Sequence, residues 1–282
     1  SIQVPALAHS IMGVSARCGN LRNLFLVNYG MVGRLLQACS SKSSVMAASF
    51  ELLKKGETIG SLAMTEESGG SNSKAFTTRL TRSNKIFLLN GSKIWITLGA
   101  ISDFYIVQAW VGEHLRLVYV PSSSNGVLFK PISSPLGCRG SGLAEITFQD
   151  VEIDEQHILP CKIEECGEIA SHEYIVRNGR FFAGASGLGM GLGALSEATK
   201  VLLSKKNFKG ALFFQGDWQS KISELYIRSI AIKELLSKIE SNFNYFLSSG
   251  LDKFTPLKIL GTQFAMECSA LLVKACGAES FK

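Results

Sequence analysis

The stretch LAMTEESGGSNSK at residues 62–74 places a hydroxyl, a carboxylate and two glycines where a short apolar run ends. Met64 and Thr65 end the expected strand, so we expect their backbone groups to be free to pair with the edge of a polar ring. Gly70 lets a backbone approach closely, and Ser71 can donate to a phosphate oxygen. A plain turn explains the same residues, so the stretch predicts either a turn or a cradle for a phosphate-bearing ligand.

A second candidate is KIWIT at residues 93–97. Because side chains alternate along a strand, we expect Ile94 and Ile96 on one face and Trp95 and Thr97 on the other. Trp95 could cover a flat heteroaromatic ring while Thr97 hydrogen-bonds a ring nitrogen. Packing of the tryptophan on a barrel rim is the alternative. Together with the first stretch, the pattern favours a flavin dinucleotide.

Other kinds of site find little support in the sequence. The seven cysteines and four histidines form no metal-ligand spacing, so we predict no metal, and an odd cysteine count without secretory features favours the cytosol or another reducing compartment. The net charge of +6 is scattered, which argues against nucleic acid. No uninterrupted apolar run reaches the ~18 residues of a membrane span. In GASGLGMGLG, Gly187, Gly191 and Ala194 share one side of a helix, which predicts close packing of a neighbouring helix and not a dinucleotide fingerprint.

The periodicity of apolar residues divides the chain into three parts. Residues 1–57 have helical spacing, residues 58–160 alternate with period two between turn signals, and residues 161–282 return to long amphipathic helices. We therefore predict an α+β fold with an N-terminal helical domain, a central antiparallel β-barrel and a C-terminal antiparallel helical bundle.

The motifs and their order resemble those of the acyl-CoA dehydrogenase family. LAMTEESGGSN is similar to the family's A-x-T-E-P-x-A-G-S-D, and LNGSKIWITLGAISDFYIV is similar to L-N-G-x-K-x-W-I-T-N-G-x-x-A-D. PLGCRGSGLAEITFQDVEI matches a third block, and Arg180 with the helix after it resembles the first helix of the family's C-terminal bundle. By comparison with the family, both terminal domains are expected to be truncated.

This resemblance implies FAD as the cofactor and a set of contacts to it. The implied FAD-binding residues are Met64, Thr65, Gly70, Ser71, Trp95, Ile96, Thr97, Lys205, Phe208 and Gln215. Lys205 stands where the family usually has an arginine that reaches the FAD of a neighbouring subunit. The family's usual glutamine aligns with Gly216 in this sequence, and Gln215 is the residue next to it. Ser71 and Arg180 are the implied substrate-binding residues.

The catalytic base cannot be assigned from the sequence. The family's glutamate lies either in a segment after the last bundle helix or just before the arginine matched by Arg180, and that second position is Gly179. Glu173 and Glu279 are the nearest carboxylates in the sequence, and neither matches a family position.

The resemblance implies dehydrogenation α,β to the carbonyl of an acyl thioester, carried on coenzyme A or on an acyl carrier protein. The phrase GSGLAEITF is similar to members that oxidise carrier-bound extender units. A homologue that has lost the base, and a flavin-dependent oxygenase, are the other hypotheses. The implied partners are an electron-accepting flavoprotein and further copies of the chain in a homodimer or homotetramer.

Overall fold

The computed structural model describes residues 1–83, 86–163, 168–249 and 251–281. Cys166, one of the seven cysteines, lies outside these ranges. The chain forms two compact units: Ser1–Ile2 with Asn23–Gly179, and Gln3–Arg22 with Arg180–Lys282. The division into domains at residues 57 and 160 remains a prediction.

The main part of the first unit begins at Asn23, the last residue of α2 (Gly19–Asn23), and continues into the π-helix η1 (Leu24–Gly33) and α3 (Arg34–Cys39). Helix α4 (Ser44–Lys55) follows; Ser43 caps its start by accepting from Met46 N at 3.4 Å, and Gly56 ends it at a φ of 74°. The helices expected before residue 57 are confirmed, including the end of α4 at Lys-Lys-Gly. Asn28 in η1 is buried and accepts from the N–H of Gly60, which joins the helices to the sheet.

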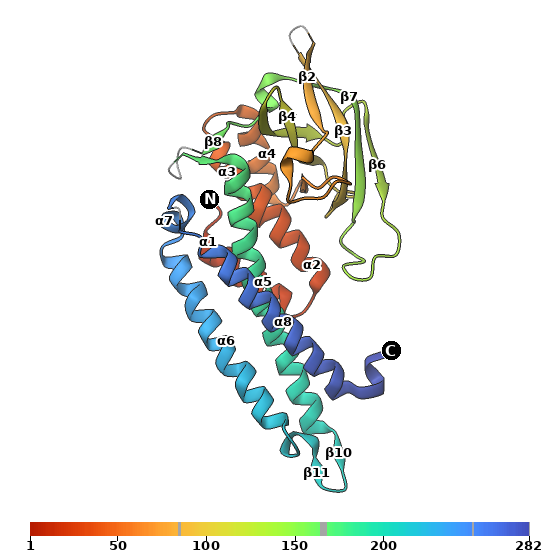
Figure 1. The fold of residues 1–282 in the computed structure, drawn as a ribbon, viewed down its shortest axis with the longest axis vertical. Helices are drawn as coiled ribbons and strands as arrows, with labels where there is room; N and C mark the ends of the chain where they lie inside the picture. The colour runs from red at the N-terminus through yellow and green to blue at the C-terminus, as the bar shows by residue number, and fades with distance from the viewer. Residues whose placement is uncertain (84–85, 164–167, 250, 282) are drawn as a thin grey trace. The chain divides into compact units, whose positions relative to one another are not determined.

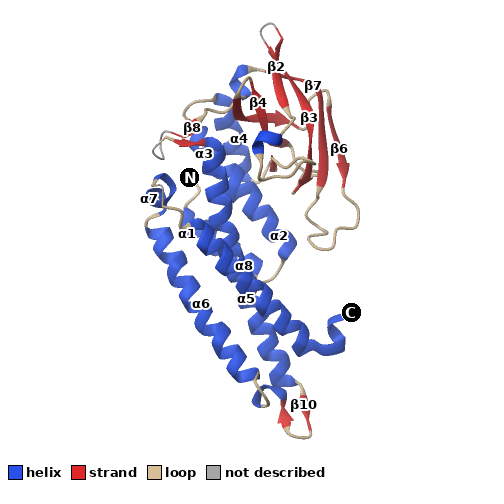
Figure 2. Cartoon of the chain, viewed as in Figure 1, coloured by secondary structure: helices blue, strands red, loops and turns tan. Residues whose placement is uncertain are grey.

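The sheet contains seven strands in the order β1-β4-β2-β3-β7-β6, with β5 on the other edge of β4 (Figure 1). Their bounds are β1 Gly60–Ala63, β2 Arg79–Ser83, β3 Ile86–Ile96, β4 Phe104–Val111, β5 His114–Pro121, β6 Val127–Pro131 and β7 Ala144–Ile153. The core beneath this sheet consists of alternate apolar side chains such as Leu89, Val107, Val118, Ile146 and Phe148. Figure 2 shows that strands gather in this sheet, apart from short hairpins such as β8–β9 (Lys162–Ile163 with Ile169–Ala170).

The sheet is mixed, whereas an antiparallel barrel was expected. Strands β1 and β2 lie one after the other along the same edge of β4, pairing with Phe104–Val107 and with Trp110 and Val111. Both run parallel to β4. Residues 64–78, which connect the two strands, leave the sheet edge after β1 and come back to it so that β2 runs in the same direction as β1. The α+β class and the order of helices, sheet and helices are confirmed.

The second unit consists mainly of helices. They are α1 (Val4–Ser15), the main part of α5 (Ser171–Ser204), α6 (Trp218–Ser241), α7 (Phe243–Ser248) and α8 (Phe254–Cys276), followed by the 3-10 helix η6 (Gly277–Phe281). A small hairpin, β10 (Lys206–Asn207) with β11 (Gly210–Ala211), and the 3-10 turn η5 (Leu212–Phe214) link α5 to α6.

Glycines on α5 let two other helices come into backbone contact with it. A Cβ added at Gly187 would lie 2.5 Å from the carbonyl carbon and oxygen of Gly261 in α8, and one added at Gly191 would overlap the ring of Phe264. On another side of α5, Gly189 and Gly193 meet the backbone of Met12 and of Ala16, which directly follows α1. The packing expected at Gly187 and Gly191 is therefore present, and the loss of about 1 kcal/mol of helix propensity per glycine is compensated by close packing.

Candidate functional site

The stretch after β1 folds into a tight turn. Glu66 N donates to Gly69 O at 3.2 Å, and Gly69 N donates back to Glu66 O at 2.9 Å, so Glu67 and Ser68 occupy the corner. Gly69 has a φ of 115°, a conformation that residues with a Cβ rarely adopt. The turn brings the motif back on itself immediately after Met64 and Thr65.

Glu66 is the anchor of this turn, and its side chain is only 4% exposed. Its Oε2 accepts from the N–H and the hydroxyl of Thr77 at 2.7 and 2.9 Å, and its Oε1 accepts from Thr78 N at 3.1 Å and from Lys93 Nζ at 2.8 Å. Burial opposes ionisation of this carboxyl, but the hydrogen bonds from Lys93, Thr77 and Thr78 outweigh it and lower its pKa to about 2. Glu66 is therefore a structural carboxylate.

Lys93, in β3, is completely buried. Besides Glu66, its Nζ donates to the carbonyl oxygen of Met64 at 3.1 Å and lies 4.5 Å from the centre of the Phe76 ring. Burial lowers the pKa of Lys93, and the bond to Glu66 acts in the opposite direction. The lysine thus ties β3 both to the turn and to the peptide that ends β1.

Acid is expected to weaken the fold through Glu66. The pKa of this carboxyl falls from 4.5 to about 2 on folding, so its contribution is complete above pH 4.5 and is lost as the pH falls towards 2. That shift corresponds to about 3 kcal/mol. Urea unfolding at several pH values should show a decline of this size between pH 4.5 and 2 that Glu66→Gln does not share. Parallel declines in both proteins would contradict the assignment.

Thr65 lies beside β3 and beside the glycines of the turn. Its carbonyl oxygen accepts from Ile94 N at 2.9 Å, and a Cβ added at Gly70 would lie 3.1 Å from its hydroxyl oxygen. The expectation that all backbone groups of Met64 and Thr65 are free is wrong for the two carbonyls, because Lys93 and Ile94 bind them. In the described part of the chain no acceptor pairs with the Thr65 N–H, so this edge presents donors.

The strict alternation expected for KIWIT is interrupted by a bulge. Trp95 has a φ of 58°, and the pairing of β3 with β7 shifts between Lys93 and Ile96. Lys93 and Ile96 are consequently buried, while Trp95 is 57% exposed. Thr97 is half-buried and so is Ile94, so the prediction that Ile94 and Ile96 share the core face is wrong. The bulge leaves the ring of Trp95 at the surface, and the preceding residue, Ile94, donates to the Thr65 carbonyl.

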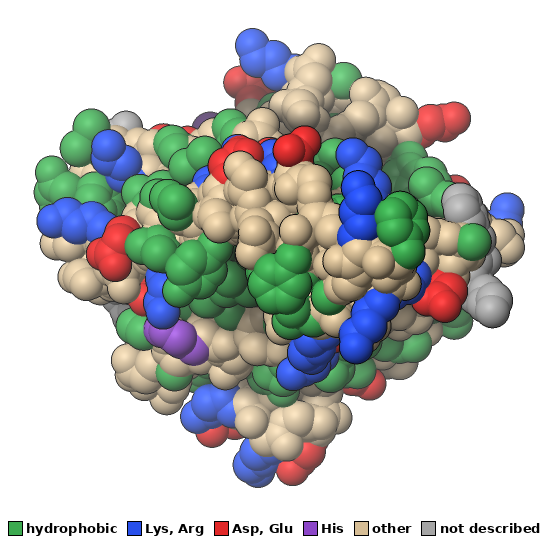
Figure 3. Space-filling view, turned by 90° about the horizontal axis from the view of Figure 1, so that it is seen from below, with side chains coloured by type: hydrophobic (Ala, Val, Ile, Leu, Met, Phe, Trp, Pro, Cys, Tyr) green, Lys and Arg blue, Asp and Glu red, His purple; other side chains and the backbone are tan. Residues whose placement is uncertain are grey.

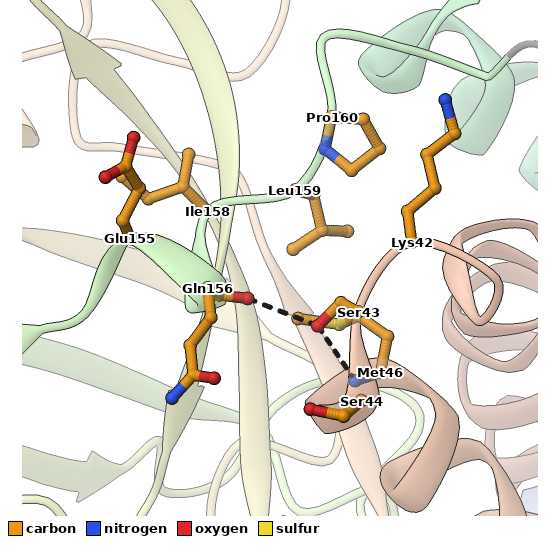
Figure 4. Close-up of a pocket in the computed structure, with 9 residues that line it drawn as sticks. All are labelled: Lys42, Ser43, Ser44, Met46, Glu155, Gln156, Ile158, Leu159 and Pro160. Carbon is orange, nitrogen blue, oxygen red and sulfur yellow. Dashed lines mark hydrogen bonds between the residues drawn. The ribbon is translucent and has the colours of Figure 1, made fainter.

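Of two cavities in the first unit, one borders the Thr-Glu turn. One of about 420 Å³ is lined by residues that include Glu66, Glu67 and Glu145, so its charge does not suit a phosphate, and Trp95 and Thr65 are not part of its lining. The other, of about 390 Å³, lies at the start of α4 (Figure 4). There the Ser43 hydroxyl donates to Gln156 O at 3.3 Å and caps the helix, which is a structural use of this group.

The remaining predicted cofactor residues belong to the second unit. Lys205 Nζ donates to Cys276 O at 2.6 Å and lies 3.2 Å from Glu279 Oε2. The amide of Gln215 bonds Asn207 and the carbonyls of Gly210 and Ala211, which fixes the β10–β11 hairpin. Phe208 at the hairpin tip is 93% exposed. Roles of these three residues in FAD binding remain predictions.

The predicted substrate contacts are exposed. Ser71 lies at the surface of the first unit, and Arg180 pairs with Asp252 at 3.2 Å in the second. Both roles remain predictions.

Both carboxylates considered as a base form ion pairs. Glu173 pairs with Arg177 one helical turn later, and Glu279 pairs with Lys205. At Gly179 a Cβ would lie 2.7 Å from the Cε of Met31, so methionine occupies the space beside this position. In the described ranges, no carboxylate is identified as the base.

The sequence analysis missed Lys93 and Glu66 as a pair. The signal that pointed to them was a lysine at the start of an otherwise apolar strand segment, and a glutamate directly after the strand-ending Met-Thr. Because a buried charge requires a partner, an inward lysine predicts an inward carboxylate.

Comparison with known proteins identifies the sheet. Residues 61–151 match the acyl-CoA dehydrogenase middle domain. This part of the chain, about a third of its length, resembles the acyl-CoA dehydrogenase family. The match covers β1 and almost all of the sheet, including both the Thr-Glu turn and KIWIT, so the family resemblance is confirmed.

Relatives within this family extend the match. The chain is 25% identical over 241 residues to the mitochondrial very long-chain specific acyl-CoA dehydrogenase of Bos taurus, covering 81% of this chain and 36% of that protein. An acyl-CoA dehydrogenase of Bacillus subtilis is 28% identical over 203 residues, 70% of this chain and 53% of the relative. The chain thus spans about a third to a half of the length of these relatives.

The fold is shared with solved structures. Glutaryl-CoA dehydrogenase from Mycobacterium smegmatis aligns with a TM-score of 0.91 at 21% identity, covering 100% of this chain and 71% of that chain. A second structure of a glutaryl-CoA dehydrogenase from this organism, in complex with FADH2, gives 0.90 at 20% identity, with the same coverage.

Proposed function

We propose that this protein binds FAD and dehydrogenates an acyl thioester, in the first instance an acyl-CoA, between its α and β carbons. The observation that carries this proposal is the donor edge after β1, where both carbonyls are engaged, the Thr65 N–H has no acceptor among the described residues and the Thr65 hydroxyl lies beside Gly70. A flavin ring presents oxygen and nitrogen acceptors along one edge and an apolar face. When bound, oxidised flavin supplies the electron sink for the hydrogen that leaves the β carbon as hydride.

The residues of this chain fit such a group. Gly70 leaves space next to the Thr65 hydroxyl that a side chain would fill. Trp95 provides an exposed aromatic surface for the ring, and the half-buried Thr97 lies two residues further along. Met64, Thr65, Ile96 and Thr97 would hold and orient the ring, Ser71 and Arg180 would meet the thioester, and Lys205, Phe208 and Gln215 would contribute to FAD binding.

A second hypothesis is a homologue that has no base of its own. It is favoured by the ion pairs of Glu173 and Glu279 and by Met31 beside Gly179. The alternative substrate, an acyl group on a carrier protein, gains no support from the relatives described above. The proposal also includes a flavoprotein as the electron acceptor and a reducing compartment as the location.

The visible absorption spectrum distinguishes these functions. The dehydrogenase hypothesis predicts a flavin spectrum in the purified protein that bleaches on anaerobic addition of an acyl-CoA. A flavin spectrum that no acyl thioester bleaches would favour the homologue without a base. A protein that stays colourless with added FAD would overturn the proposal.

Trp95→Ala is expected to weaken FAD binding by about tenfold, since aromatic contacts contribute roughly 0.5–1.5 kcal/mol beyond the buried area. Trp95→Phe, which keeps an aromatic ring, should stay within about threefold of the unmodified protein. Titration of apoprotein with FAD, followed by quenching of flavin fluorescence, measures both. Equal affinities for all three proteins would remove Trp95 from the proposed site.

We also propose that copies of the chain associate through α8. One face of this helix packs within its unit, yet four large apolar side chains of the helix are exposed, those of Ile259, Leu260, Met266 and Val273. Figure 3 shows apolar side chains exposed over a broad area of one face of the molecule, with Lys and Arg side chains around them. Among the described residues, Phe254–Ser280 is the one helix long and apolar enough to span a membrane. Core helices can have the same length and composition, so this is weak support for a membrane span.

Sedimentation is expected to show a dimer or tetramer. Met266→Lys with Val273→Lys should shift the protein towards the monomer, because two charges would enter the apolar contact. Lys258→Glu on the same helix, which is a charge change outside that stripe, is the matched control. An unmodified protein that sediments as a monomer would contradict the association.

A further inference from the structure

The peptide between Met64 and Thr65 is asymmetric in its hydrogen bonding. Its carbonyl oxygen accepts from Lys93 Nζ at 3.1 Å, and Lys93 is fully buried. The peptide is trans, so its N–H, which belongs to Thr65, points in the opposite direction from the lysine. One end of this peptide therefore meets a buried cation while the other end lies at the donor edge.

A cation on the carbonyl oxygen polarises the whole amide group. Electron density moves towards the oxygen, which makes the N–H at the other end a stronger donor, and the effect is larger in a buried setting than in water. The next peptide adds no further free group, since the Thr65 carbonyl accepts from Ile94 N at 2.9 Å and the Glu66 N–H donates to Gly69 O. Both carbonyls that follow β1 are therefore bound, and the Thr65 N–H is the donor that remains at this edge among the described residues.

Glu66 does not cancel this polarisation. Its carboxylate accepts from Thr77 N, the Thr77 hydroxyl and Thr78 N as well as from Lys93, so its negative charge is shared among four donors. The carbonyl of Met64 contacts only the cationic member of the pair. Lys93 acts on the peptide directly, and Glu66 keeps the lysine charged and in place.

We propose that Lys93 is a positioning residue that polarises the Met64–Thr65 peptide, so that the Thr65 N–H stabilises the negative charge gained by the flavin ring on reduction. This inference rests on the proposed FAD function. A merely structural lysine would hold the turn to β3 without any preference for reduced over oxidised flavin. The reduction potential of the bound flavin separates the two roles, because it compares affinity for the two redox states.

The test uses paired neutral variants, since Lys93→Met alone leaves Glu66 buried without its cation. In Lys93→Met with Glu66→Gln, the preference for reduced over oxidised FAD is expected to fall about tenfold, which is a potential about 30 mV lower for a two-electron couple. Lys93→Arg keeps the charge and should stay near the unmodified potential. Lys74→Met, which removes an exposed lysine of the same loop, is the matched control and should also leave it unchanged.

The outcomes are distinguishable. A neutral pair that binds oxidised FAD with unaltered potential overturns the inference but leaves the proposed function intact. An equal fall in Lys74→Met also overturns it, because the effect would then be one of general charge. If Lys93→Met with Glu66→Gln fails to fold, Lys93→Gln with Glu66→Gln replaces it, because this variant keeps a neutral donor for the Met64 carbonyl. A reduction potential equal to that of the unmodified protein would again overturn the inference. An unmodified protein that binds no FAD refutes the proposed function itself.

Discussion

Lys93→Met as a single change is expected to lower the free energy of unfolding by about 3–5 kcal/mol, because it leaves the carboxylate of Glu66 buried without its cation. The side chain of Glu66 is 4% exposed and that of Lys93 is not exposed at all, so water cannot replace the lost partner. Thr77 and Thr78 still donate to the carboxylate, which keeps the cost within this range. Urea unfolding followed by circular dichroism measures the change.

The double change Lys93→Met with Glu66→Gln is the control for this result. It removes both charges together, and the single amide oxygen introduced by Glu66→Gln can still accept from Thr77, so most of the lost stability should return. The single change should also become less harmful at low pH, where Glu66 is protonated. A single variant as stable as the double variant at neutral pH would show that the buried pair does not contribute as described.

The general architecture could be predicted because its signals are local. Helical spacing before residue 57, alternation up to residue 160 and the long amphipathic runs afterwards each depend on neighbours in the sequence, and the helices and strands follow them closely. The parallel pairing of β1 and β2 with β4 could not be read in this way. It depends on where residues 64–78 return along the sheet, which is a long-range property.

The candidate site was predicted in part for the same reason. The two motif stretches do lie side by side, since the Thr65 carbonyl accepts from Ile94 N next to the bulge. The bulge itself escaped the alternation rule, because one extra residue in a strand reverses the faces of those that follow. The bonds from Lys205 to Cys276 O and Glu279 could not be predicted either, because both partners lie more than 70 positions after Lys205 in the sequence.

Gly187→Leu is the second change with a large expected effect, a loss of about 3 kcal/mol or more in the free energy of unfolding. A Cβ at this position would lie 2.5 Å from the carbonyl group of Gly261 and 2.8 Å from the N of Thr262, and all these atoms are backbone. A flexible side chain could move away, but here α5 and α8 themselves would have to separate. Overpacking a tight core commonly costs roughly 1–3 kcal/mol, and a backbone obstacle places this site at the upper end or beyond.

A matched pair of alanine variants isolates the packing term from helix propensity. Gly13 in α1 has no atom within 4 Å of an added Cβ, so Gly13→Ala should stabilise the protein by about 1 kcal/mol through propensity alone. Gly187→Ala gains the same propensity in α5 and should nevertheless destabilise, because the methyl group cannot be accommodated without moving α8. Thermal unfolding of the two variants should therefore shift in opposite directions. A rise in both melting temperatures would show that α5 and α8 do not meet at Gly187, and the leucine variant would then be expected to fold normally.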